Sequence, residues 1–123
     1  MIVLNKTKDK ILLIKQYNRD DYILVAGYVN IGENAENTVV REVKEETGLN
    51  VIDLKFNKSE YFSKSNTLML NFSCVVDCED VILNEEVDEA KWLSLKDAYE
   101  NIMPCSLAKS FLKYYIKKNN IVF

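Results

Sequence analysis

The sequence predicts an α/β protein in which helices pack on a mixed β-sheet. Stretches of β-forming residues bounded by polar turns are interspersed with segments of helical periodicity. The chain has 123 residues and is 48% hydrophobic, which suffices for one substantial core. Its three glycines and single proline exclude a collagenous or low-complexity chain. We therefore expect residues 1–123 to form one domain without internal repeats or linkers.

Three strands are expected before the first helix. They are Ile2–Leu4, 11–17 and 22–29, all rich in β-branched, leucine and tyrosine residues. The charged residues 5–10 form a hairpin loop between the first two strands, and the polar residues 18–21 form a turn before the third.

A helix is expected over Ala35–Thr47. Asn34 can cap its first turn and Gly48 suits the position just past its end. Its apolar positions recur at helical spacing, at Ala35, Val39, Val40 and Val43.

Extended structure is expected again after this helix. Segments 51–56 and 60–63 are extended, residues 63–66 form a turn, and 68–76 form a strand. In this last strand the polar and apolar residues alternate only partially, which indicates a strand covered on both faces. Residues 91–95 form the final strand.

Two helices complete the expected fold, over 95–102 and 106–118. The second carries an apolar stripe, which we interpret as core packing, at Leu107, Phe111, Tyr114 and Tyr115. The exposed part of residues 111–116 is a candidate contact surface for a homodimer.

Composition excludes several classes of function. The net charge of −3 argues against a nucleic-acid polymer as partner. No apolar run approaches the roughly 20 residues of a membrane span, and the N-terminus does not resemble a secretory signal, so we expect a cytoplasmic protein. The absence of histidine excludes Ser-His and Cys-His catalysis. Three cysteines in such a chain are expected to be reduced.

The first helix carries an unusual stripe of carboxylates. With about 100° of rotation per residue, Glu42, Glu45 and Glu46 fall within an arc of about 100° that borders the apolar stripe. Like charges at this spacing destabilise a helix by about 0.2–0.5 kcal/mol per pair, which suggests that the cluster has a use. Oxygen ligands suit Mg²⁺ or Mn²⁺ rather than zinc. A solvated acidic face is the alternative interpretation.

Residues 27–49 resemble the signature of the Nudix hydrolases, G-x5-E-x7-R-E-U-x-E-E-x-G-U, where U is a bulky aliphatic residue. Every specified position is filled without insertion. The matching residues are Gly27, Glu33, Arg41, Glu42, Val43, Glu45, Glu46, Gly48 and Leu49.

The resemblance implies an α/β/α sandwich that hydrolyses a nucleoside diphosphate linked to another group, with Mg²⁺ or Mn²⁺ bound on the helix. It implies that Glu42 and Glu46 are metal ligands and that Glu45 is a ligand or positions the attacking water. Arg41 is then an orienting partner. Gly27 and Glu33 support the loop, and the Gly27 carbonyl is a further candidate ligand.

Family members often add one carboxylate from outside the helix. In residues 84–92, Glu86 is the first candidate and Glu89 the second. The alternative interpretation is an exposed acidic loop before the buried Trp92.

Residues 59–72, together with Ala26–Val29, partly resemble the NADH pyrophosphatase subfamily. Ser59 and the Leu68-Met-Leu-x-Phe72 block match, but the proline-rich centre of the subfamily motif is missing. The expected substrate is thus an NADH-like or ADP-ribose-like nucleotide, and the candidate substrate-binding residues are Tyr28, Glu33, Tyr61 and Phe62. Tyr61 or Phe62 could stack on a base, although packing is the alternative.

Two other functions stay open. One is the same chemistry on nucleoside triphosphates, including damaged ones. The other is a catalytically inactive nucleotide-binding sensor. The intact cluster of three glutamates argues against the sensor, because an inactive site has no reason to retain mutually repelling acids.

Overall fold

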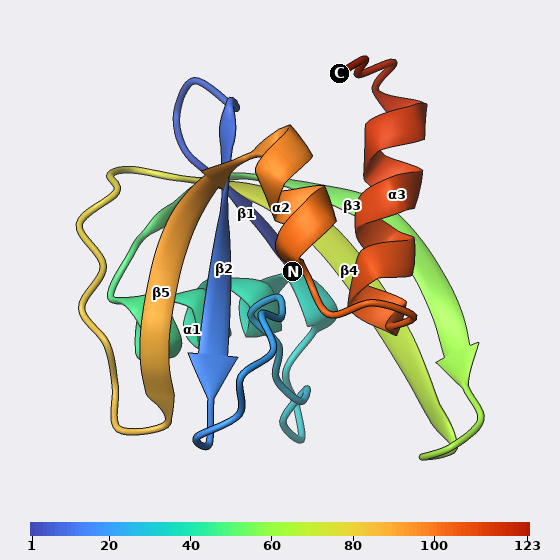
Figure 1. Ribbon diagram of the computed structural model, residues 1–123. Helices are drawn as coiled ribbons and strands as arrows, with labels where there is room; N and C mark the ends of the chain where they lie inside the picture. Colours follow the sequence, from blue (N-terminus) through green and yellow to red (C-terminus); the bar gives the residue numbers. More distant parts are fainter.

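A five-stranded mixed sheet forms the centre of the computed structural model, which describes residues 1–123 (Figure 1). Its strands are β1 (Ile2–Leu4), β2 (Lys10–Gln16), β3 (Val51–Phe62), β4 (Thr67–Val76) and β5 (Val87–Ser94). They lie in the order β3-β4-β1-β2-β5. Strands β1 and β4 are parallel, whereas all other neighbours are antiparallel. The predicted mixed sheet is confirmed.

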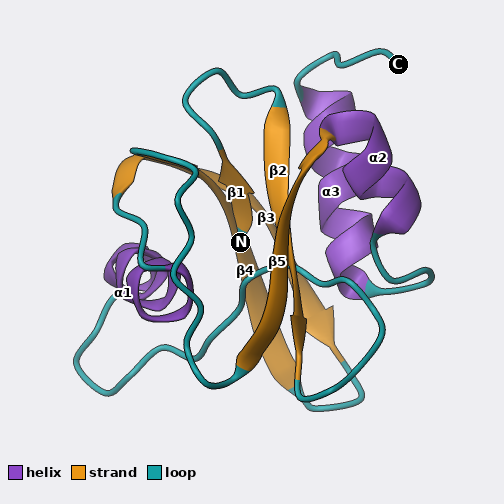
Figure 2. Ribbon diagram, turned by 60° about the vertical axis from the view of Figure 1, so that its left-hand side comes forward, coloured by secondary structure: helices purple, strands orange, loops and turns teal.

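Three helices cover the two faces of this sheet. Helix α1 (Ala35–Thr47) lies on one face, and α2 (Leu95–Asn101) and α3 (Leu107–Lys118) lie on the other (Figure 2). The expected α/β/α sandwich is therefore confirmed. None of the three helices has the length and apolar character needed to span a bilayer.

Strand β2, an inner strand of the sheet, explains why both faces need a cover. Ile11 and Leu13 pack with α2 and α3, whereas Leu12 and Ile14 pack with α1, and all four side chains are fully buried. Successive side chains of a strand point to opposite faces, so a run of four apolar residues fills two cores. Each such burial contributes about 1.5–3 kcal/mol relative to exposure.

The strand predicted over 22–29 is wrong. Only Tyr22 and Ile23 form bridges, to Ile102 and Ile14 respectively, and the chain from Leu24 onward joins no ladder. Ile23 bridges Ile14 on the edge of β2 opposite β5, but from Leu24 the chain leaves this edge, and the Val25 carbonyl accepts a hydrogen bond from the Met1 amino group instead. The segment is still extended in character, because the buried side chains of Leu24 and Val25 enter opposite cores.

Two further boundaries differ from the prediction. The segments 51–56 and 60–63 belong to one strand, β3, whose register shifts between Phe56 and Lys58. At this bulge the buried Asn57 donates its side-chain N–H groups to Asn71 Oδ1 at 2.9 Å and to the Phe111 carbonyl at 3.1 Å. These bonds let a polar residue continue the strand. Strand β5 also begins earlier than predicted, at Val87.

The predicted apolar stripe of α3 lies largely in the core. Phe111 and Tyr115 are buried, whereas Tyr114 is 36% exposed. Leu112 and Ile116 are buried as well, so the exposed part of residues 111–116 consists of Lys113 and Tyr114 and offers little apolar area to a second copy. All three cysteines are free.

Candidate active site

Helix α1 begins and ends at the residues that its capping chemistry predicts. The side chain of Asn34 accepts a hydrogen bond from the backbone N–H of Asn37 at 2.8 Å. Gly48 adopts the left-handed conformation, with φ of 75°, and its N–H donates to the Lys44 carbonyl. A glycine tolerates this φ without strain. The acidic stripe therefore lies on a helix with well-defined ends.

The three glutamates of this stripe line one hollow. Glu42, Glu45 and Glu46 face it from α1, and it is completed by Asn84, Glu85 and Glu86 from the segment before β5. None of the six lining residues is hydrophobic. Of the two predicted outer acids, Glu86 lines the hollow, whereas Glu89 lies along β5 with its carboxylate bonded to the Tyr22 hydroxyl. The geometry thus favours Glu86 over Glu89.

Arg41 links three of the other predicted signature residues. Its Nε and Nη2 donate to the two carboxylate oxygens of Glu33 at 2.9 and 3.0 Å, a bidentate pair. Its Nη1 donates to Glu42 at 2.7 Å and to Glu45 at 3.2 Å. Nη2 also donates to the Tyr28 carbonyl at 2.9 Å. One guanidinium therefore connects the loop before α1 to two of the three acids.

Glu46 differs from the other two acids because it is buried. Only 6% of the residue is exposed, whereas the Glu45 side chain is 55% exposed. Burial, reinforced by the neighbouring carboxylates of Glu42 and Glu86, raises the pKa of Glu46 to about 7. Gln16 Nε2 donates to Glu46 Oε2 at 3.3 Å and opposes this shift. Such a carboxylate can take up a proton near neutral pH.

Gly27 lies directly against Glu42. A Cβ atom at position 27 would fall 2.1 Å from Glu42 Cδ and 2.5 Å from Glu42 Oε1. Real side chains cannot approach this closely, so the Glu42 carboxyl group occupies the space that only a glycine leaves free. This contact gives a steric reason for a glycine at position 27.

Three residues at the hollow were not predicted. Asn84 donates to the Glu45 carbonyl at 3.2 Å, and its Oδ1 accepts from the backbone N–H of Glu86 at 3.0 Å. The Tyr17 hydroxyl donates to Glu86 Oε2 at 3.1 Å. Gln16 donates to Glu46, as described above. These three residues lie outside the signature segment 27–49 and contact the acidic residues of the hollow through hydrogen bonds. The only sequence signal was Asn84, whose type favours turns.

The aromatic candidates lie away from the hollow. Tyr28 is 82% exposed, and Tyr61 and Phe62 belong to the far end of the β3–β4 hairpin. Tyr61 and Phe62 are consecutive in β3 and therefore point to opposite faces of the sheet, so they cannot both stack on the same base. None of the three lines the hollow.

A metal site is not preassembled in this arrangement. No group of three or more acidic or cysteine side chains is already positioned to hold an ion. The hydrogen bonds from Arg41 Nη1 explain this, because they draw Glu42 and Glu45 toward the guanidinium. The donor set itself consists of oxygen atoms only, which is what Mg²⁺ and Mn²⁺ require.

Glu33 should make the protein sensitive to acid. Hydrogen bonds from Arg41 and Thr38 lower the pKa of Glu33 to about 2, below its usual value of 4.5. Because the folded-state pKa is depressed, this contribution to stability is complete above pH 4.5 and is lost as the pH falls toward 2. We expect Glu33→Gln to be less stable than wild type at pH 6, with the difference shrinking in acid. Urea unfolding between pH 6 and 2 checks this, and a constant difference would contradict it.

The sequence matches a known family over most of its length. The family model described as the NUDIX domain matches residues 1–114. The protein named NAD-capped RNA hydrolase NudC from Pseudomonas aeruginosa is 32% identical over 123 residues, covering 98% of this chain and 44% of its own length. The same-named protein from Pseudomonas putida F1 is 30% identical over 119 residues, covering 94% and 42%. The chain thus spans less than half the length of these relatives.

Solved structures share the fold. A Caenorhabditis elegans Ap4A hydrolase, in a binary complex, aligns with a TM-score of 0.77 at 20% identity, over 97% of this chain and 95% of that chain. The NUDIX domain of Shewanella oneidensis NrtR, complexed with ADP ribose, aligns with a TM-score of 0.76 at 16% identity, over 96% and 84%. These similarities confirm the architecture of the sheet and its helices.

Proposed function

Because this chain belongs to the NUDIX family of hydrolases, we propose that it hydrolyses the diphosphate linkage of a nucleoside diphosphate derivative. One observation carries the proposal. Glu42, Glu45, Glu46 and Glu86 line a single hollow that contains no hydrophobic side chain. With Glu85, five acids line this hollow and repel one another, and a bound cation would relieve that repulsion.

The cation would be Mg²⁺ or Mn²⁺, held by Glu42, Glu46 and Glu86, with Glu45 and the Gly27 carbonyl as further ligands. The fit rests on the all-oxygen donor set and on the space that Gly27 leaves for the Glu42 carboxyl group. When bound, such an ion neutralises diphosphate oxygens and makes the attacking water more acidic.

The other steps of hydrolysis would depend on side chains of the protein. Glu45 or Glu46 would accept the proton that the attacking water loses. Arg41 keeps Glu42 and Glu45 oriented through its hydrogen bonds. Attack on one phosphorus breaks the bridging P–O bond and yields two phosphate products.

NADH or ADP-ribose is the substrate class that we favour. The partial NADH pyrophosphatase pattern around Ser59 and Phe72 supports it, as does the name of the Pseudomonas relatives, which specifies an NAD-linked end. That name also specifies an RNA, so NAD-capped RNA is a substrate to test. Nucleoside triphosphate hydrolysis is the second candidate, and the inactive sensor is the third.

A substrate panel tests the proposal. NADH, ADP-ribose, a dinucleoside polyphosphate, a nucleoside triphosphate and NAD-capped RNA would be incubated with the protein and Mg²⁺ or Mn²⁺, and the products identified by mass spectrometry. We expect NADH or ADP-ribose to give AMP as one product. Triphosphate hydrolysis alone would favour the second candidate, and no turnover of any compound at saturating metal would favour the sensor.

A further inference from the structure

Lysine side chains gather on the face formed by β3 and α3. Helix α3 contains four lysines and no acidic residue. None of the lysines on this face forms an ion pair, because the only lysine in a salt bridge is Lys10, with Glu79. We define the lysine face by Lys8, Lys55, Lys58, Lys113, Lys117 and Lys118. The acids of β3 on the same side, Asp53 and Glu60, are too few to neutralise it.

An aromatic ring lies within this face. Lys58 Nζ is 5.1 Å and Lys118 Nζ is 5.8 Å from the centroid of the Tyr114 ring, which is 36% exposed. Exposed aromatic rings among ammonium groups are typical of surfaces that bind single-stranded nucleic acid. The ring stacks on a base while the ammonium groups contact phosphates.

A small hollow lies beside Lys118, one of the two lysines at the ring. It encloses about 110 Å³, and its charged lining residues are Lys8, Lys55, Lys118 and the acid Asp53. The hollow therefore offers three ammonium groups to a phosphate, beside one carboxylate.

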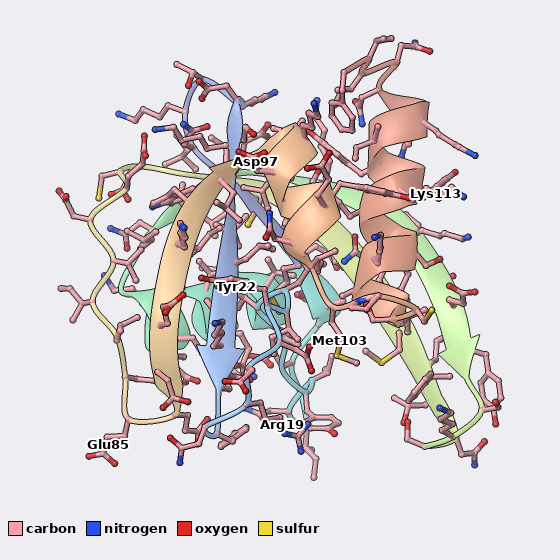
Figure 3. The ribbon with its side chains drawn as sticks, in the orientation of Figure 1. Arg19, Tyr22, Glu85, Asp97, Met103 and Lys113 are labelled. Carbon is pink, nitrogen blue, oxygen red and sulfur yellow. The ribbon has the colours of Figure 1, made fainter.

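The net charge of the chain conceals this arrangement. The acidic hollow lies beside α1 on one face of the sheet, whereas α3 lies on the other face. Figure 3 shows Glu85 and Lys113 at opposite sides of the molecule. A total of −3 is therefore the sum of an acidic side and a basic side. Net charge thus does not exclude a nucleic-acid partner for the lysine face.

We propose that the lysine face binds single-stranded RNA, with phosphates at the lysines and a base on Tyr114. The choice of RNA rests on the proposed function. The bound RNA would be the polymer part of a substrate whose 5′ end carries the nucleotide with the diphosphate linkage. Because the face and the acidic hollow lie on opposite sides, the same RNA reaches both only by passing around the sheet edge.

Binding is measured by fluorescence anisotropy of an uncapped, unstructured RNA of about 20 nucleotides, in EDTA and at several salt concentrations. We expect the double variant Lys58→Gln/Lys118→Gln to bind on the order of tenfold more weakly and to reduce the slope of log K against log salt by about 1.4. Tyr114→Ala should lower the RNA affinity by about fivefold or more. Tyr114→Phe, which keeps the ring, should bind RNA as wild type does.

The matched control is Lys91→Gln/Lys96→Gln, which removes the same charge at β5 and the start of α2. An equal loss of RNA binding in this control would overturn the proposal, as would no binding by wild type. Tighter binding to single-stranded DNA, or to phosphatidylserine vesicles, would also overturn it. ADP-ribose hydrolysis should be unchanged in all the lysine variants. Because RNA binding is measured without metal, an inactive enzyme would contradict the proposed function alone.

Discussion

Glu46→Gln is expected to lower turnover by about 10² to 10⁴-fold at saturating metal, without loss of the fold. Glu46 is the buried acid of the hollow, and burial raises its pKa to about 7. Glutamine has the same shape but accepts no proton. The measurement is kcat for the substrate found in the panel, together with the melting temperature.

Metal titration separates two roles for Glu46. If kcat falls while the Mn²⁺ affinity is retained, Glu46 acts as the base. If both fall, it acts as a ligand. Glu36→Gln provides the matched control, since Glu36 lies in the first turn of the same helix and does not line the hollow. Turnover equal to that of wild type at saturating Mg²⁺ would contradict a catalytic role for Glu46.

Local signals made α1 predictable from the sequence. Its start depends on one side-chain cap at Asn34, and its end depends on one left-handed glycine at Gly48. The acidic stripe follows from helical geometry alone, so its position on one side could also be derived. The resemblance to a family signature then added the roles of these residues.

Strand pairing was less predictable because it depends on distant partners. Residues 22–29 have β-forming side chains, but only Ile23 bridges β2, and the chain then leaves that edge to contact the Met1 amino group at Val25. The bulge at Asn57 likewise depends on contacts with Asn71 and the Phe111 carbonyl. The pattern of residue types shows that a segment tends to be extended, but it does not show whether a neighbouring strand is available to pair with it.

The contacts around the acids show the same limit. Gln16, Tyr17 and Asn84 reach Glu46, Glu86 and the Glu45 carbonyl from segments that are 30, 69 and 39 residues away. No local pattern marks such contacts. The predicted aromatic substrate contacts at Tyr61 and Phe62 lie away from the hollow because both residues belong to the far end of the β3–β4 hairpin, and no local pattern shows how far that hairpin extends.

Gly27→Ala is expected to weaken Mn²⁺ binding by about 10- to 100-fold, with a corresponding loss of activity at limiting metal. The new Cβ would lie 2.1 Å from Glu42 Cδ, so the Glu42 carboxyl group must move. The obstructed atoms belong to the end of a flexible side chain rather than to the backbone. The fold should therefore survive, and the melting temperature should stay close to that of wild type.

Gly32→Ala separates this crowding from a general effect of removing a loop glycine. Gly32 has a φ of +82°, and a Cβ added there would meet no atom within 4 Å, so alanine introduces backbone strain without touching an acid. We expect Gly32→Ala to lose about 1–2 kcal/mol of stability and to keep its Mn²⁺ affinity. Isothermal titration of both variants decides the matter. If Gly27→Ala binds Mn²⁺ as wild type does, Glu42 is not a ligand whose position depends on Gly27, and the metal site must be built from the remaining acids.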